Sequence, residues 1–162
     1  MKKTLSKDEM LFKLTAQCSQ AEYCTYDIIR KLINWGAEEK VRGQIVRHLI
    51  ENRYVDDTRF CRAFIDHKLR FNRWGKRKIE QVLCQKHISK DIYSPLLEAS
   101  DSDAQQETLL ALLLTKLPTI KATTDYERRG KLVRFALQRG FEMGMIYACL
   151  DRMNLRGDDY GD

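Results

Sequence analysis

The sequence predicts an all-α protein made of three tandem three-helix repeats of helix–turn–helix-like form, stacked into an elongated, curved module. Apolar residues recur at helical spacing along almost the whole chain, and strict alternation is nowhere sustained. Only two prolines, Pro95 and Pro118, interrupt the 162 residues, so long helices are possible. A six-position pattern also recurs twice along the chain, which indicates repeats.

The first predicted repeat, residues 1–54, holds three helices. Ser6 and Glu9 have the spacing of a capping box, which marks the start of the first helix. The second helix begins after Thr25 and ends at Gly36, where a helix-ending glycine is expected. The three apolar stripes are Met10, Leu11, Leu14, Cys18 and Ala21; Ile28, Ile29, Leu32 and Ile33; and Val41, Ile45, Leu49 and Ile50.

The second predicted repeat, residues 55–100, contains the fourth, fifth and sixth helices. Asp56 or Asp57 is the expected cap of the fourth helix. We expect Phe64 to lie in the core, and Pro95 to kink or shorten the sixth helix. The stripes are Phe60, Cys61, Phe64, Ile65 and Leu69; Ile79, Val82 and Leu83; and Ile92, Leu96 and Leu97.

The third predicted repeat, residues 101–154, follows a polar junction. Ser102 and Gln105 offer a second capping box, and Pro118 should stop the seventh helix. We expect residues 155–162 to form a frayed polar tail. The stripes are Leu109, Leu110, Leu112, Leu113, Leu114 and Leu117; Leu132, Val133, Phe135 and Ala136; and Met145, Ile146, Cys149, Leu150 and Met153.

The repeats share a register. Ile28, Leu32, Gly36, Val41, Ile45 and Val46 align with Ile79, Leu83, His87, Ile92, Leu96 and Leu97, and then with Leu132, Ala136, Gly140, Met145, Cys149 and Leu150. The third position ends a helix in each copy, and a His there adopts the left-handed conformation at some cost. Chance similarity between amphipathic helices is the alternative. A unit of about 50 residues buries too little surface alone, so neighbouring units should stack.

The remaining composition argues against several classes of protein. The longest apolar run, Leu109 to Leu114, is far shorter than the roughly 20 residues of a membrane span. No apolar signal-peptide core follows the basic start, so we expect a cytoplasmic protein without a membrane partner. Five cysteines without a CxxC pair are typical of buried thiols in a reducing compartment.

Motifs that would carry chemistry are missing from the sequence. There is no GxxxxGK[ST], GxGxxG, GxSxG or HExxH pattern, and His and Cys do not combine at metal-ligand spacing. Asp56 and Asp57 could suggest a metal or an acid–base pair, but a capping role explains them as well. We therefore expect no enzyme activity, no catalytic residue, no cofactor and no metal.

Charge is concentrated in the middle of the chain. The segment from Arg59 to Lys90 contains ten Lys and Arg residues and two acids, so its net charge is +8. Because the net charge of the whole chain is +6, the remainder carries −2. Such a segment favours a polyanion or an acidic protein surface as the partner.

Two adjacent groups supply the candidate contact residues, which are Arg59, Arg62, Arg70, Arg73, Trp74, Lys76, Arg77 and Lys78. One predicted stripe of the fourth helix carries Arg59, Arg62, Arg70 and Arg73 together with Asp66. The others begin the fifth helix, where cations cost roughly 0.3–1 kcal/mol each against the helix dipole but would help to hold a phosphate or carboxylate. A solvated face is the alternative for the stripe. Trp74 could stack on a base or pack the turn against the core.

Three segments resemble the RecX family. Residues 53–61, RYVDDTRFC, resemble its GYIDDxRFA segment. Residues 75–79 with 83–89 resemble its G…+I…L..KGIS stretch, and residues 131–141 resemble its KL…L..RGF stretch. The departures are Arg53 for Gly, Cys61 for Ala and His87 for Gly.

The resemblance implies a monomeric regulator of recombinational DNA repair and the SOS response. Such a protein lodges in the groove of the RecA–single-stranded DNA filament and bridges neighbouring subunits. There it inhibits strand exchange, ATP hydrolysis and the coprotease role, and it binds naked DNA more weakly. The alternatives are a direct helix–turn–helix DNA binder and a helical-repeat scaffold for other proteins. A direct binder would hold naked DNA with a steep salt dependence, and a scaffold would show no dependence on DNA.

Overall fold

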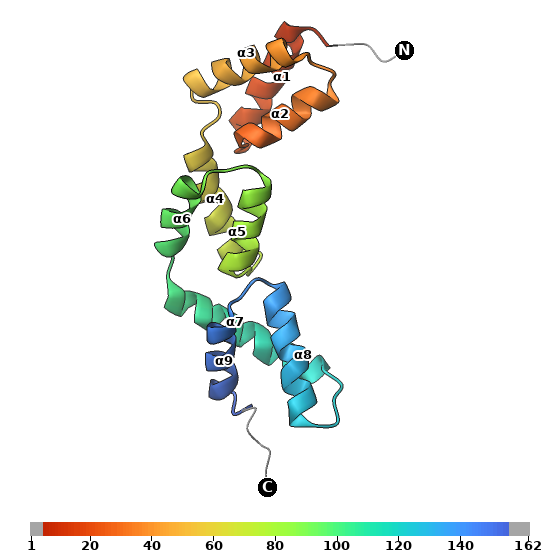
Figure 1. The fold of residues 1–162 in the computed structure, drawn as a ribbon, viewed down its shortest axis with the longest axis vertical. Coiled ribbons are helices and arrows are strands. Elements are labelled where there is room, and N and C mark those ends of the chain that lie inside the picture. The colour runs from red at the N-terminus through yellow and green to blue at the C-terminus, as the bar shows by residue number, and fades with distance from the viewer. Residues whose placement is uncertain (1–4, 156–162) are drawn as a thin grey trace. The chain divides into compact units, whose positions relative to one another are not determined.

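The computed structural model describes residues 5–155, whose regular elements are all helical (Figure 1). The elements are α1 (Lys7–Gln20), α2 (Thr25–Asn34), α3 (Glu39–Glu51), α4 (Asp57–Arg70), α5 (Lys76–Gln85), α6 (Lys90–Glu98), α7 (Ser102–Lys116), the 3-10 helix η1 (Leu117–Thr119), α8 (Asp125–Gln138) and α9 (Met143–Arg152). No strand occurs in this range, which confirms the predicted all-α class. Residues 1–4 of the basic start and 156–162 of the predicted tail lie outside the described residues. Leu155, the first residue of the predicted frayed tail, instead packs against the core of unit 2.

Backbone proximity divides the chain into two units. Unit 1 combines residues 5–64 with Leu83–Leu96, and unit 2 combines Ile65–Val82 with residues 97–155. Helices α4, α5 and α6 therefore contribute to both units. The repeat boundaries after residues 54 and 100 stay predictions.

Each unit has its own apolar core. In unit 1 one core cluster consists of the buried residues Met10, Leu14, Ile28, Leu32, Ala37, Ile45, Leu49 and Val55. In unit 2 one core cluster consists of Leu109, Leu112, Leu113, Leu132, Ala136, Phe141, Ile146, Cys149 and Leu150. Most of these residues belong to the predicted stripes, and each fully buried Leu or Ile contributes about 1.5–3 kcal/mol.

Some apolar stripe members are wrong as core predictions. Ile33, Ile50 and Leu114 are 43%, 47% and 51% exposed. Ile33 and Ile50 each follow a fully buried leucine, and one step along a helix turns a side chain by about 100°, away from the core. Phe64 is half-buried rather than fully buried, so its predicted place in the core is only partly correct.

The helix-ending position confirms the register of the repeat. Gly36, His87 and Gly140 have φ values of +79°, +57° and +93°. In each copy the amide of the following residue donates to the carbonyl five positions earlier: Ala37 to Leu32 at 3.0 Å, Ile88 to Leu83 at 3.2 Å and Phe141 to Ala136 at 3.2 Å. This is the bonding of a Schellman cap, so one turn geometry recurs three times.

The N-terminal caps agree with the sequence in part. The Ser6 hydroxyl accepts a hydrogen bond from the Glu9 amide, as expected. The prediction for α7 is wrong by one residue, because the Asp101 carboxylate caps that helix by accepting from the Ala104 amide. Gln105 is buried instead, and its side-chain amide donates to the Ser100 hydroxyl.

The two adjacent acids before α4 have separate capping roles. Asp56 caps its own helix, since its Oδ1 accepts from the Arg59 amide at 3.0 Å. Asp57 Oδ1 accepts from the amide and hydroxyl of Thr25, at 2.8 and 3.1 Å, and so stabilises the first turn of α2. Hydrogen bonding thus accounts for both acids without a metal.

Two sequence features end or shorten helices as expected. Pro95 lies inside α6, which at nine residues is the shortest described α-helix. Pro118 lies in η1, directly after α7 ends. None of the described helices has both the length and the apolar character that crossing a bilayer requires.

Candidate functional site

The turn between α4 and α5 in unit 2 concentrates cations and aromatic rings. We call residues 67–78 the basic turn. It contains six of the eight predicted contact residues: Arg70, Arg73, Trp74, Lys76, Arg77 and Lys78. The arginines are exposed, whereas Trp74, Lys76 and Lys78 are half-buried.

The backbone of the basic turn is held by the turn between α8 and α9. The Gly75 amide donates to the Arg139 carbonyl at 2.7 Å, and the Arg77 amide donates to the Gly140 carbonyl at 3.0 Å. The Arg139 guanidinium donates back to the Asn72 carbonyl at 3.1 Å. These three bonds fix the direction in which the turn presents its side chains.

Backbone from another helix occupies part of the first turn of α5. A carbonyl oxygen from the end of α8 already accepts from the Arg77 amide. The C-terminal end of α8 therefore packs against the N-terminal end of α5. The opposite signs of the two helix dipoles at these ends favour the contact. The Arg77 amide is therefore not available to an anion at the basic turn.

Trp74 packs within the basic turn. The ammonium groups of Lys68 and Lys78 lie 4.6 and 4.4 Å from its ring centroid, and its amide donates to the Lys68 carbonyl at 3.0 Å. Cation–π contacts of this kind are worth about 0.5–1 kcal/mol at exposed sites. Of the two roles considered for Trp74, this geometry favours packing over base stacking.

The predicted arginine stripe is shorter than its spacing suggests. Helix α4 ends at Arg70, and Arg73 has a φ of +55°, so Arg73 lies in the turn and not on the helix. Arg70 Nε is 3.2 Å from an Asp66 carboxylate oxygen, but both side chains are more than 60% exposed. Such a pair contributes little and leaves Arg70 able to exchange partners.

Arg59 and Arg62 belong to unit 1. Arg62 is exposed on α4. Arg59 is half-buried: its Nε donates to Glu22 at 2.6 Å, and its Nη2 donates to the carbonyls of Arg53 and Tyr54. The hydrogen bond that Arg59 donates to Glu22 raises the pKa of Arg59. These bonds give Arg59 a structural role in joining the loop between α1 and α2 to the loop before α4.

Phe71 is a further residue of the basic turn, outside the predicted contact residues. Its side chain is 72% exposed between the cations of the basic turn, and its ring centroid is 5.1 Å from that of His67. Helical spacing gave no signal of this exposure, because Phe71 would continue the face of Phe60 and Phe64 if α4 did not end at Arg70. An aromatic residue that the core does not use, beside Arg70 and Arg73, is typical of nucleic-acid or protein contact surfaces.

A groove of about 750 Å³ adjoins the basic turn within unit 2. Leu69, Arg70 and Arg73 line one side, and the first half of α7 lines the other. The α7 side includes Asp101 and Glu107, and Glu107 forms an ion pair with Arg152. The groove is therefore mixed in charge, unlike a continuous phosphate track.

No group of three or more His, Cys, Asp or Glu side chains in residues 5–155 is placed to hold a metal ion. Of the five cysteines, Cys24, Cys61 and Cys149 are buried, Cys18 is half-buried and Cys84 is exposed. Burial raises the pKa of Cys24 to about 12 and that of Cys61 to about 11.

Comparisons with known proteins agree on one family. The family profile for the second three-helix domain of RecX matches residues 56–94, and that for the third three-helix domain matches residues 103–150. A regulatory protein RecX from Clostridium botulinum is 31% identical over 68% of this chain and 52% of its own length. One from Chlorobium phaeobacteroides is 29% identical over 90% of this chain and 95% of its own length.

Solved structures show the same fold. The crystal structure of RecX from Lactobacillus salivarius has a TM-score of 0.79 at 16% identity, covering 93% of this chain and 97% of that one. A crystal structure of regulatory protein RecX has a TM-score of 0.78 at 19% identity, covering 89% and 74%. The chain spans about half the length of the Clostridium botulinum relative and 95% of the Chlorobium one.

Proposed function

Since this chain belongs to the RecX family of regulatory proteins, we propose that it binds the filament of RecA recombinase on single-stranded DNA and inhibits its strand exchange and ATP hydrolysis. It acts in the cytoplasm as a monomer, by occupying a surface and without chemistry or a cofactor of its own. The basic turn makes the central contact. Recombinational repair and the SOS response are the processes it regulates.

The observation that carries this proposal is the composition of the basic turn. Three exposed arginines, Arg70, Arg73 and Arg77, belong to the same turn as the exposed ring of Phe71. Guanidinium groups bind phosphates and carboxylates through paired hydrogen bonds, and an exposed ring stacks on a base or an apolar side chain. A filament offers phosphates, bases and carboxylates together.

The adjoining groove favours a protein-coated strand over naked DNA. Its α7 side bears Asp101, which would repel a bare phosphate backbone, and Glu107, whose charge is shared with Arg152. A recombinase surface has cations and amides that can meet those acids. The mixed charge of the groove is thus the observation that favours binding to a filament over direct binding to naked DNA.

The test is a binding assay that compares naked and recombinase-coated DNA. Fluorescence anisotropy would follow a labelled thymidine oligomer, alone and coated with RecA in a non-hydrolysable ATP analogue, as this protein is titrated. We expect tighter binding to the coated strand by at least tenfold. Equal or tighter binding to naked DNA with a steep salt slope would favour the direct binder and contradict the proposal.

Phe71→Ala examines the contact itself. The ring is 72% exposed, so its loss should leave the helical content unchanged while weakening filament binding about tenfold, the scale of one lost stacking contact. Phe12→Ala is the matched control, since Phe12 is 76% exposed on α1. Equal effects of the two substitutions would remove the basic turn from the interface.

A further inference from the structure

A second site lies in unit 2, on α8 and α9. A pocket of about 410 Å³ is lined by residues of these two helices, among them Arg129, Gly130, Arg134 and Tyr147. None of them belongs to the basic turn. We propose that this pocket is a docking site for an acidic peptide segment of a protein partner, with an acidic side chain bound by the arginines and an aromatic or apolar one by the tyrosine rings.

The two arginines have unused hydrogen-bonding capacity. Arg129 places its guanidinium 4.9 Å from the ring centroid of Tyr147, and its Nε is buried with no hydrogen-bond partner in the described part of the chain. Arg134 is exposed and makes no hydrogen bond or ion pair within residues 5–155. The Arg129 guanidinium is thus fixed against a ring, and that of Arg134 lacks an acceptor. Such groups suit a carboxylate, which accepts two parallel hydrogen bonds.

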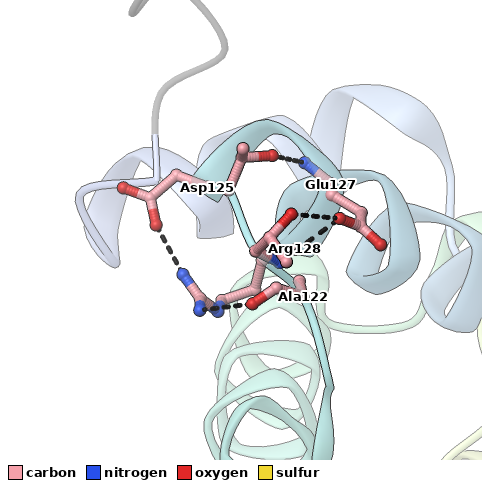
Figure 2. Close-up of polar contacts among 6 residues, drawn as sticks. Ala122, Asp125, Glu127 and Arg128 are labelled. Carbon is pink, nitrogen blue, oxygen red and sulfur yellow. Dashed lines mark hydrogen bonds and ion pairs between the residues drawn. The ribbon is translucent and has the colours of Figure 1, made fainter.

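The acids near the pocket are already engaged (Figure 2). The Asp125 carboxylate accepts from Arg128, which also donates to the Ala122 carbonyl. The Glu127 carboxylate accepts from the amide and hydroxyl of Thr123 at 3.3 and 3.1 Å, and these bonds lower its pKa. The cations on the pocket side are not matched by similar pairs, so the pocket attracts anions.

Aromatic surface completes the site. Tyr126 and Tyr147 are 67% and 41% exposed, and both line the pocket. A Cβ built on Gly130 would meet nothing within 4 Å, so the middle of the pocket is open space over the helix backbone. A ligand side chain can therefore lie against the backbone of α8 between the rings and the guanidinium groups.

A peptide fits this pocket better than a DNA strand. Single-stranded DNA needs a basic groove that follows several phosphates, whereas this pocket holds two arginines and is lined also by Glu127. A peptide supplies one or two carboxylates together with backbone N–H donors that can face Glu127. Charge and size thus both favour an acidic peptide.

The test uses the full chain labelled with ¹⁵N, observed by two-dimensional NMR. The probe is a capped pentapeptide of order Glu-Glu-Phe-Glu-Glu, compared with its Gln-Gln-Phe-Gln-Gln analogue and with a thymidine pentanucleotide. We expect the acidic peptide to shift the Gly130 amide resonance in a saturable way. The Gln analogue and the pentanucleotide should bind with an apparent affinity at least tenfold lower.

Two variants locate the binding. Arg129→Gln with Arg134→Gln should weaken the acidic peptide about tenfold or more, whereas Arg30→Gln with Arg47→Gln, at exposed positions of α2 and α3, should not. Gly130→Leu fills the pocket but keeps both cations, and it should abolish the shift. Gly43→Leu is its control, since the space around Gly43 is also open.

The proposal is overturned if the acidic peptide gives no saturable shift at the pocket, if Gly130→Leu still binds, or if the pentanucleotide binds the pocket more tightly. It does not rest on the filament proposal. Loss of filament binding in Phe71→Ala with normal peptide binding, or the reverse, separates the two sites.

Discussion

Gly75 lies against Gly140 so closely that a Cβ on Gly75 would be 2.3 Å from the Gly140 carbonyl carbon. A Cβ on Gly140 would in turn be 2.4 Å from the Cβ of Lys78. Backbone here touches backbone, so neither glycine can be replaced without separating the basic turn from the end of α8. The contact joins the second and third predicted repeats within unit 2.

Gly75→Ala should therefore destabilise the protein by about 2–3 kcal/mol, because a rigid backbone must move to accommodate the methyl group. Thermal unfolding followed by circular dichroism measures the loss. Gly43→Ala is the control: it adds the same methyl group to an exposed position of α3 with open space, so it should be neutral or stabilising by about 0.5–1 kcal/mol. Equal melting temperatures for the two variants would contradict the close contact.

An equivalent contact in unit 1 uses side chains. Lys86 Nζ lies 2.6 Å from Asp27 Oδ1, with both side chains at most one quarter exposed, and the rings of Tyr26 and His87 are 5.1 Å apart. In the repeat register Lys86 and His87 correspond to Arg139 and Gly140. In unit 1 the end of α5 contacts the start of α2 through an ion pair. In unit 2 the end of α8 contacts the start of α5 through two glycines. In both cases the middle helix of one predicted repeat contacts the middle helix of the repeat before it.

A double-mutant cycle with Lys86→Met and Asp27→Asn should give a coupling free energy of about 1 kcal/mol from urea unfolding. The cycle is needed because Asp27 Oδ2 also accepts from the Cys24 amide at 3.3 Å. The exposed pair Asp66 and Arg70 should couple by less than about 0.5 kcal/mol. Equal coupling of the two pairs would show that burial does not strengthen the first.

Phe64→Ala should cost about 1–2 kcal/mol of stability. The ring is half-buried and packs on Phe60 with 5.5 Å between centroids, so truncation removes only part of a core contact. Leu83→Ala, at a fully buried position of α5, should cost about 2–5 kcal/mol. A larger loss for Phe64→Ala than for Leu83→Ala would mean that Phe64 is a core residue after all.

The cysteines should differ sharply in reactivity. At pH 8 a chromogenic disulfide reagent should modify Cys84 rapidly, because it is exposed, and should leave Cys24 and Cys61 unmodified until the protein unfolds. Mass spectrometry of the digested protein would identify the modified thiol. Rapid modification of Cys24 in the folded protein would contradict its burial.

The buried thiols of Cys24 and Cys61 should make the protein less stable at alkaline pH. Burial raises the pKa of Cys24 to about 12 and of Cys61 to about 11, above the ordinary value of 9.0. Between pH 9 and 11 the folded state therefore binds more protons than the unfolded state, and the free energy of unfolding should fall as the pH rises. Cys24→Ala with Cys61→Ala should flatten this decline in urea titrations.

Features that depend on residues close together in the sequence could be predicted, whereas features that depend on distant residues could not. The helices and the repeat follow from local spacing, and even His87, where glycine is common, was placed correctly at a left-handed helix end. The wrong cap at Ser102 arose because Asp101, one residue earlier, competes for the same role.

The candidate site was less predictable because it depends on distant partners. Spacing alone could not show that Glu22, 37 residues away, binds Arg59, or that carbonyls of Arg139 and Gly140 occupy the start of α5. Both contacts form only when helices far apart in sequence meet. The exposed ring of Phe71 could not be found from spacing either, because Phe71 would continue the face of Phe60 and Phe64 if α4 did not end at Arg70.

The most direct test of the central claim is RecA ATP hydrolysis on single-stranded DNA, titrated with this protein and with Arg70→Glu/Arg73→Glu. Arg30→Glu/Arg47→Glu is the control with the same change in charge. We expect inhibition by the wild-type and control proteins, and a concentration for half-inhibition raised about tenfold or more in the basic-turn variant. Unchanged inhibition by that variant, with normal circular dichroism, would contradict the account.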